Sequence, residues 1–167
     1  PPSMLYPNGL HRDSFLPTIA LLQKHLDVFE VEAGVDYRLR ALEQVEIYHY
    51  PADAAAEKKM LDYFRMVAGG EGKKGGSIEV LDRQIETLRR GNGVIWFDFK
   101  TLCGGPRSQN DYLEIARSYH TVLLSHIPKM TANQASEARR FTWLIDVFYD
   151  HKVKLISTAD CPPEQLY

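Results

Sequence analysis

A glycine-rich stretch is the first place in this sequence where residue types and spacing suggest chemistry. Five of the eight residues in the range 69–76 are glycine, and Gly72 is followed by two lysines. A phosphate-binding loop uses backbone N–H groups and a lysine to hold phosphates, but it also needs Ser or Thr after that lysine and a glycine five positions before the Gly-Lys pair. Lys74 and Val67 occupy those two positions. We therefore predict that residues 69–77 form a flexible loop and not a nucleotide cradle.

Two apolar runs end in polar residues, at the point where a phosphate-loop ATPase places the acids that hold Mg²⁺. The run that ends at Asp98 continues with Phe99, and the run that ends at Leu124 continues with Ser125 and His126, so neither carries an acidic pair. The six histidines and two cysteines lack metal-ligand spacing, and no Gly-x-Ser-x-Gly motif is present. We predict no metal site, and no nucleotide hydrolysis by this chain alone.

Three arginines have positions that suit contact with an anion. Arg12 lies three residues before Phe15, at the N-terminal end of an apolar helical stripe. Arg139 and Arg140 open a predicted helix, near the positive end of its dipole, where an anionic partner would relieve an unfavourable cation. Each of the three also fits an ordinary surface arginine. The residues alone leave both interpretations open.

Composition excludes several classes of protein. Twenty basic and twenty-two acidic residues give a net charge of -2, so there is no excess of positive charge to indicate nucleic-acid binding. No apolar run approaches the roughly 18 residues that a membrane-spanning helix needs, and no signal-peptide pattern opens the chain. The two cysteines are far apart, which indicates reduced thiols. We expect a soluble cytosolic protein with one buried core.

The second half of the chain alternates between strand and helix patterns. Three apolar runs predict strands, at residues 94–99, 121–125 and 153–157. Two amphipathic helices are predicted between them, one capped by Ser108 and the other by Thr131 or Asn133. This order predicts parallel strands joined by right-handed crossovers, with 121–125 and 153–157 as neighbours or near neighbours. It indicates a layered α/β fold.

The first half is less regular. A helical pattern begins at Asn8, and Pro17 either opens the helix or follows a short turn and a kink. Strand-like runs cover residues 28–31 and 45–50, and an amphipathic helix is predicted over 54–67.

After the glycine-rich loop, residues 78–80, 84–88 and 94–99 predict a small β-meander. We therefore divide the chain into residues 1–68, the loop 69–77 and a C-terminal region over 78–167.

A short repeat links the two ends of the chain. Residues 1–6 read Pro-Pro-Ser-Met-Leu-Tyr, and residues 162–167 read Pro-Pro-Glu-Gln-Leu-Tyr. The second copy follows a strand-like run, and a Pro-Pro step suits a strand exit that leads into a helix. By analogy, we expect that a strand precedes the first copy, and that the sequence begins within a domain.

Five segments together resemble the ZapE and AFG-like family of AAA+ ATPases. They read Leu-Tyr-Pro-Asn-Gly-Leu-His-Arg-Asp-Ser-Phe-Leu-Pro-Thr-Ile (5–19), Val-Asp-Tyr-Arg (35–38), Trp-Phe-Asp-Phe-Lys-Thr-Leu-Cys (96–103), Asn-Asp-Tyr-Leu (110–113) and Ala-Arg-Arg-Phe-Thr-Trp-Leu-Ile-Asp-Val-Phe-Tyr-Asp (138–150). They follow the family's order and extend over nearly the whole chain. Ser125 and His126 depart from the acidic residues that the family carries before Pro128.

The resemblance implies a partial AAA+ P-loop domain, whose phosphate loop and Mg²⁺-binding acids precede residue 1. ATP and Mg²⁺ would then belong to the full-length parent protein, a homo-oligomer, and this fragment would be inactive alone. Arg12 resembles the arginine finger that reaches the nucleotide of a neighbouring subunit. Arg139 or Arg140 resembles a second-sensor arginine that contacts the bound nucleotide.

The resemblance also implies that the parent remodels protein partners. ZapE-like members act at the bacterial division ring with the tubulin-like protein FtsZ, in the cytoplasm, and AFG-like members serve mitochondrial protein quality control. A second class of function fits the sequence as well. The chain could be a nucleotide-independent protein-interaction module, whose exposed tyrosines and glycine-rich loop bind a partner.

Overall fold

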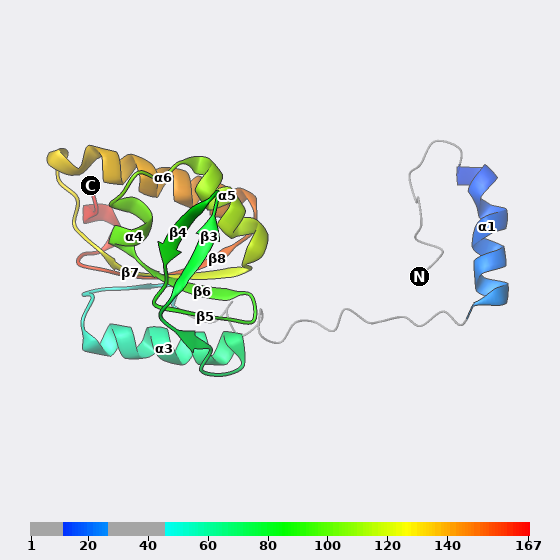
Figure 1. The fold of residues 1–167 in the computed structure, drawn as a ribbon, viewed down its shortest axis with the longest axis horizontal. Helices are drawn as coiled ribbons and strands as arrows, with labels where there is room; N and C mark the ends of the chain where they lie inside the picture. Colours follow the sequence, from blue (N-terminus) through cyan, green and yellow to red (C-terminus); the bar gives the residue numbers. More distant parts are fainter. Residues whose placement is uncertain (1–11, 27–45) are drawn as a thin grey trace. The chain divides into compact units, whose positions relative to one another are not determined.

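The computed structural model describes residues 12–26 and 46–167, which belong to two separate units (Figure 1). The first unit contains α1 (Arg12–His25), a helix with Pro17 inside it and Ile19 as its one buried residue. The helix therefore begins before Pro17, and no separate turn precedes the proline within residues 12–26. Pro17 is the sixth residue of α1, beyond the first turn, so it lacks the backbone hydrogen bond to Asp13, and a proline at such a position favours a kink. The strand expected at 28–31 lies outside the described residues.

The second unit is built on a six-stranded sheet in the order β1-β8-β7-β6-β5-β2. Its parallel part is formed by β1 (Tyr48–His49), β8 (Lys154–Ala159), β7 (Thr121–Ile127) and β6 (Val94–Asp98). Two antiparallel strands, β5 (Arg89–Gly91) and β2 (Lys73–Lys74), complete it. The three strands predicted in the second half are confirmed. The last two of them are parallel neighbours, as expected.

Helices cover both faces of this sheet (Figure 1). One face carries α3 (Ala54–Ala68), and the other carries α4 (Phe99–Cys103), α5 (Gln109–Ser118) and α6 (Ala135–Asp150). The connection from β6 to β7 contains α4 and α5. The connection from β7 to β8 contains a 3-10 turn (Ala132–Gln134) and α6. The layered α/β architecture with crossover helices is therefore confirmed.

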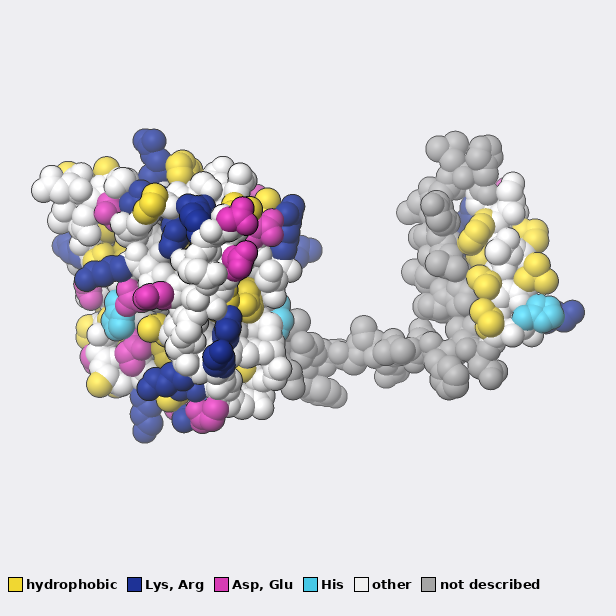
Figure 2. Space-filling model, in the orientation of Figure 1, with side chains coloured by type: hydrophobic (Ala, Val, Ile, Leu, Met, Phe, Trp, Pro, Cys, Tyr) yellow, Lys and Arg dark blue, Asp and Glu magenta, His cyan; other side chains and the backbone are white. Residues whose placement is uncertain are grey.

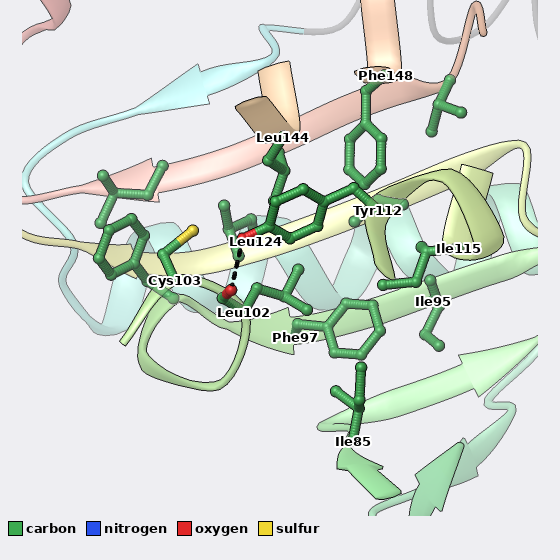
Figure 3. Packing of buried hydrophobic residues seen from close by; sticks show 14 of the residues in the cluster. Ile85, Ile95, Phe97, Leu102, Cys103, Tyr112, Ile115, Leu124, Leu144 and Phe148 are labelled. Atoms are coloured by element: carbon green, nitrogen blue, oxygen red, sulfur yellow. Dashed lines mark hydrogen bonds between the residues drawn. The ribbon is translucent and has the colours of Figure 1, made fainter. Parts of the chain in front are cut away.

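The central strand β6 is buried on both sides, because its side chains alternate between two apolar clusters. Trp96 packs with Phe64 of α3, and Phe97 packs in the larger cluster formed with α4, α5 and α6. Within that larger cluster, Tyr112 is fully buried and its hydroxyl donates to the Leu102 carbonyl at 2.8 Å (Figure 3). This bond satisfies the one polar group that Tyr112 brings into the core.

The helix ends follow the capping chemistry of the sequence. Asp53 accepts a bond from the Ala56 N–H at 2.8 Å at the start of α3, and Gly69 ends that helix with a left-handed backbone. At the start of α5, the Ser108 N–H and hydroxyl both donate to Asp111, at 2.7 and 2.8 Å. The capping role expected for Ser108 is therefore confirmed.

The predicted β-meander is arranged differently from the expectation. β3 (Ser77–Val80) and β4 (Arg83–Glu86) form a separate two-stranded sheet, and β5 lies between β4 and β6 in the chain. The hairpin from β5 to β6 turns at Asn92 and Gly93, both with positive φ. A two-residue turn of this kind matches the twist of the strands that it joins. Of the run at 84–88, residues 84–86 belong to β4, and Thr87 and Leu88 form the link from β4 to β5.

The glycine-rich segment holds the edge strand β2 where the sequence predicts a loop. Gly72 has φ +60°, and a Cβ atom there would lie 2.6 Å from the Arg90 carbonyl oxygen and 2.8 Å from the Phe64 ring. Only glycine permits so close an approach of β2 to β5 and α3. Residues of all three expected segments, 1–68, 69–77 and 78–167, thus meet in this second unit, because β1 and α3 belong to it.

The surface of the second unit carries charges of both signs. On the face that Figure 2 shows, Lys and Arg side chains alternate with Asp and Glu side chains, and no large patch of one sign forms. Among the helices of the described residues, none combines the length and the apolar character needed to cross a membrane.

Candidate functional site at the carboxyl edge of the sheet

The carboxyl ends of the parallel strands meet at one edge of the sheet, which is where open α/β sheets place their ligand sites. Asp98 is the last residue of β6, His126 lies near the end of β7, and Thr158 lies near the end of β8. Glu57 reaches the same edge from the first turn of α3. We call these four residues the carboxyl-edge cluster.

His126 lies at the centre of the carboxyl-edge cluster. Its Nδ1 is 2.8 Å from Asp98 Oδ2, and its Nε2 is 3.6 Å from Glu57 Oε1. Thr158 completes the network, because its hydroxyl accepts from the His126 N–H at 3.0 Å and donates to Glu57 at 3.2 Å. The cluster therefore connects three parallel strands to α3.

An irregularity in β7 directs His126 toward this network. The pairing between β7 and β8 shifts register between Leu124 and Ile127, and His126 has φ +61°. A left-handed backbone is uncommon for a residue with a side chain, and it persists where the surroundings hold it in place. The bonds from His126 to Thr158 and Asp98 supply that restraint.

The geometry restricts the chemistry that the carboxyl-edge cluster can perform. The two ring nitrogens of His126 point to different carboxylates, so one metal ion cannot contact all three groups, and no group of metal-ligating side chains is found within residues 12–26 and 46–167. The neighbouring Ser125 is buried and accepts from Trp96 Nε1 at 2.9 Å. Among the described residues, no hydrogen bond joins Ser125 to the His126 ring, whose nitrogens face Asp98 and Glu57, so the structure shows no Ser-His pair of the kind that activates a nucleophile.

Asp98 also caps a helix. Its Oδ1 accepts from the Lys100 N–H at 2.9 Å and caps α4, while Oδ2 faces His126. Sequence reasoning considered Asp98 and His126 only as members of an acidic pair, and so missed their contact. The sequence did contain a signal for this contact: two apolar strands that are predicted to be parallel both end in polar residues.

The two arginines at the start of α6 have different surroundings. Arg140 Nε donates to the Cys103 carbonyl at 2.7 Å, and Nη2 lies 3.9 Å from Glu137, with 16% of the side chain exposed. Arg140 therefore caps the last turn of α4. Arg139 is exposed and lines a surface hollow of ≈ 570 Å³ together with Trp143.

Arg12 is the first residue of α1 and is partly buried. It belongs to the first unit, and Arg139 and Arg140 belong to the second. The roles expected for these three arginines remain predictions.

The two thiols do not form a reactive site. Cys103 and Cys161 are both buried and unpaired with each other. Burial is the main cause that raises the pKa of Cys103 to about 12. A thiol with so high a pKa stays protonated near neutral pH and is a poor nucleophile.

The similarity to known proteins extends over the whole chain. A family model described as AFG1-like ATPase matches residues 1–167. The cell division protein ZapE of Escherichia coli strain K12 is 41% identical over 167 residues, which are 100% of this chain and 44% of that protein.

Two eukaryotic proteins are also similar. An uncharacterized protein of Schizosaccharomyces pombe is 36% identical over 168 residues, 99% of this chain and 37% of that protein. Lactation elevated protein 1 homolog B of Danio rerio is 32% identical over 169 residues, 99% of this chain and 34% of that protein. The chain thus spans less than half the length of the curated relatives it matches.

Proposed function

The chain belongs to the AFG1-like ATPase family, and from this premise we propose that its parent protein is an AAA+-type ATPase that couples ATP hydrolysis to the remodelling of protein partners. The match of the family model to residues 1–167 carries the proposal. The mixed α/β unit, with mostly parallel strands and crossover helices, is consistent with part of a P-loop domain. The 167 residues contribute to the assembled enzyme and do not hydrolyse ATP alone.

Arg12 is proposed as the arginine finger, acting on ATP held by a neighbouring subunit. A guanidinium suits this role, because its planar donors can meet the charge of a transferring phosphoryl group at two points. Its position as the first residue of α1 supports the proposal, because a side chain there lies at the end of the helix.

Arg139 is the better candidate for the arginine that contacts bound nucleotide. The guanidinium of Arg140 is already bound to the Cys103 carbonyl, whereas Arg139 is exposed. A side chain that caps α4 would have to give up that bond to reach a phosphate. We therefore assign the structural role to Arg140 and the sensor role to Arg139.

The carboxyl-edge cluster does not fit Mg²⁺. Asp98 has protein donors at both carboxylate oxygens, and the imidazole of His126 occupies the place of a second oxygen ligand. Mg²⁺ prefers several oxygen ligands in octahedral geometry. We propose that other residues of the parent hold Mg²⁺ and ATP, and that the carboxyl-edge cluster ties α3 and α4 to the sheet.

The protein partners are proposed by analogy with the relatives. The name of the bacterial relative, cell division protein, favours a role in division and a bacterial cytoplasmic location. FtsZ would then be a partner. A mitochondrial role in protein quality control is the counterpart for an AFG-like member, and neither role involves nucleic acid.

Turnover of the full-length parent with Arg12→Ala tests this function. Loss of a finger lowers turnover by roughly 10³ to 10⁵ and leaves ATP affinity nearly unchanged, because the finger serves the transition state. Arg117→Ala, which removes an exposed arginine on α5, is the matched control and should keep full activity. If Arg12→Ala retains more than about a tenth of wild-type turnover, Arg12 is not a finger.

A nucleotide-independent interaction module is the second candidate function. The observation that favours it is a groove lined mainly by apolar side chains, between α6 and the edge strand β1. The same surface would serve partner binding in the ATPase as well.

A further inference from the structure

Two atoms of the carboxyl-edge cluster face each other at a distance that is too long for a hydrogen bond. His126 Nε2 and Glu57 Oε1 are 3.6 Å apart, whereas a hydrogen bond between nitrogen and oxygen spans about 2.7–3.2 Å. The neighbouring contacts are shorter. His126 Nδ1 lies 2.8 Å from Asp98, and the Thr158 hydroxyl lies 3.2 Å from Glu57. The gap between Nε2 and Oε1 therefore needs a physical explanation.

The hydrogen bond to Asp98 determines which nitrogen of a neutral imidazole carries the hydrogen. An ionised carboxylate only accepts, so Nδ1 of His126 carries the hydrogen that it donates to Asp98 Oδ2. In the neutral ring, Nε2 then has a lone pair, and this lone pair faces the Glu57 carboxylate. Two electron-rich atoms face each other favourably when a positive species, either a proton or a metal ion, lies between them.

The surroundings of the gap are negatively charged. Within residues 12–26 and 46–167, neither Glu57 nor Asp98 forms an ion pair with a lysine or an arginine, and His126 is the partner of both. Two carboxylates therefore share one imidazole. The side chains of Glu57 and Asp98 are 30% and 29% exposed, and that of His126 is 49% exposed. A cation from solution can therefore reach the gap.

The distance across the gap suits Zn²⁺. This ion binds imidazole nitrogen at about 2.0–2.1 Å and carboxylate oxygen at about 2.0–2.2 Å in tetrahedral geometry, so two of its ligand atoms lie roughly 3.4 Å apart. The 3.6 Å between His126 Nε2 and Glu57 Oε1 is close to that separation. Mg²⁺ prefers oxygen ligands, which agrees with its poor fit to this cluster.

The other contacts of the cluster hold the two ligand side chains in place. A zinc-bound histidine almost always donates its other ring N–H to a carboxylate, a carbonyl or water, and Asp98 is positioned to accept that bond. Asp98 is itself fixed by the Lys100 N–H, and Glu57 is fixed by the Thr158 hydroxyl. No three metal-ligating side chains converge within the described residues. Water molecules must therefore complete the coordination of an ion held here.

We propose that the carboxyl-edge cluster binds Zn²⁺, with His126 Nε2 and Glu57 Oε1 as its two protein ligands and Asp98 as the acceptor that orients the imidazole. The ion joins β7 to the first turn of α3. This site differs from the sequence-based prediction, which expected no metal site. It is separate from the Mg²⁺ and ATP of the parent and does not depend on the proposed ATPase function.

Calorimetric titration of the 167-residue chain with Zn²⁺, without nucleotide, measures the affinity and the number of sites. We expect a Zn²⁺ site for which Mg²⁺ at equal concentration does not compete. His126→Asn should abolish this site, because asparagine tolerates the left-handed backbone at this position but lacks the imidazole. The matched control is His151→Gln, which alters an exposed histidine at the end of α6 and should leave the affinity unchanged.

Two further variants separate the ligand from the residue that orients it. Asp98→Asn should weaken Zn²⁺ binding roughly 10- to 100-fold, the usual cost of losing such a partner. Glu57→Gln should weaken it at least as much, because it replaces a ligand but keeps an acceptor for Thr158. Glu86→Gln, at an exposed position on β4, is the control and should change nothing.

Equal affinity in wild type, His126→Asn and Glu57→Gln would show that Zn²⁺ binds elsewhere on the surface as an adventitious ion. That result, or no binding of Zn²⁺ at all, overturns the proposal. Zn²⁺ should also raise the urea midpoint of wild type but not that of His126→Asn, because a ligand of the folded chain stabilises it.

Nitrogen NMR of the imidazole addresses the rival occupant of the gap, a proton between Nε2 and Glu57. In a chain first treated with a chelator, addition of Zn²⁺ at neutral pH should shift the Nε2 resonance of His126 and leave the hydrogen on Nδ1. A spectrum in which Nε2 stays protonated, and which Zn²⁺ does not change, assigns the gap to a proton and overturns the proposal.

Discussion

Asp98 ends an apolar strand, the position from which an acidic residue could hold a metal ion. In the structure, one of its carboxylate oxygens caps α4 through the Lys100 N–H, and the other faces His126. The residue type was visible in the sequence, but its partners were not. His126 reaches Asp98 through a left-handed backbone and a register shift in β7. Neither feature can be predicted from the local pattern of residues.

His49 is a second residue whose environment the sequence could not show. Its side chain is 4% exposed, stacks on the Tyr63 ring, and has its Nε2 without a hydrogen-bond partner among the described residues. Burial, and to a smaller extent the charge of Lys59, lowers its pKa from the usual value, against the opposing effect of Glu46.

The lowered pKa of His49 predicts a loss of stability in mild acid. As pH falls through about 6.5, the unfolded chain binds this proton before the folded chain does, so the free energy of unfolding decreases until the lower folded pKa is passed. Each unit of pKa difference is worth about 1.4 kcal/mol. Urea unfolding at pH 7.5 and 5.5 should therefore show a smaller loss in His49→Gln than in wild type.

His151→Gln is the control for this measurement. His151 is exposed at the end of α6, so its removal should leave the difference between the two pH values as in wild type. An unchanged pH dependence in His49→Gln would show that the buried imidazole does not carry the effect.

At the scale of elements, long periodic segments were predictable and short irregular ones were not. The helices α3, α5 and α6 carry a clear helical period, because each buries one face, and the strands β6, β7 and β8 are recognisable as continuous runs that are largely buried. β5 has three partly buried residues, including two arginines, and nothing in its composition distinguishes it from a turn. Its place in the sheet depends on pairing with β6 and β2, which is tertiary information.

The small sheet is connected to α5 by one ion pair. Arg83 of β4 donates to Asp111, which is fully buried, and also to the Pro106 carbonyl at 2.9 Å. Burial alone would raise the pKa of Asp111, but the donors from Ser108 and Arg83 outweigh it and lower the pKa. The same carboxylate therefore caps α5 and holds β4 against it.

Arg83→Met should destabilise the chain by about 1–3 kcal/mol at pH 7, because it removes a charged donor from a buried carboxylate while keeping most of the apolar stem. Because Arg83 is partly exposed, we expect this loss of stability to be smaller than the loss on breaking a fully buried ion pair. A depressed folded pKa contributes stability above the unfolded value of about 3.9, and this contribution is lost in stronger acid. The difference between variant and wild type should therefore narrow below pH 4.

Urea unfolding of both proteins at pH 7 and pH 3.5 measures this difference. Arg117→Met removes the exposed pair with Glu114 and should cost less than about 1 kcal/mol. A cost for Arg83→Met no larger than for Arg117→Met would contradict the connecting role of Arg83.

At the scale of the whole molecule, the fold class of the second unit could be predicted, but which segments belong to it could not. Alternating strands and helices after residue 94 indicated a parallel sheet. The pairing of β1 with β8 was not evident, because it joins residues more than a hundred positions apart. The packing of α3 on the opposite face was not evident either, because it brings α3 against three separate strands, at Trp96, Leu123 and Ile156. The same limit applies to the proposed finger, since the nucleotide that it would contact is held by another subunit.

A mixing experiment with the full-length parent tests whether Arg12 acts between subunits. One subunit carries Arg12→Ala, and the other has an intact Arg12 but a disabled phosphate loop, so each is inactive alone. In a head-to-tail ring formed by random mixing, roughly a quarter of the junctions combine an intact loop with an intact Arg12 from the neighbour. The mixture should therefore recover about a quarter of wild-type turnover, because finger and nucleotide then come from different chains.

If the mixture stays as inactive as its components although both assemble together, Arg12 does not act in trans. Arg117→Ala in place of Arg12→Ala is the control, since that mixture should keep about half of wild-type turnover through its intact loops.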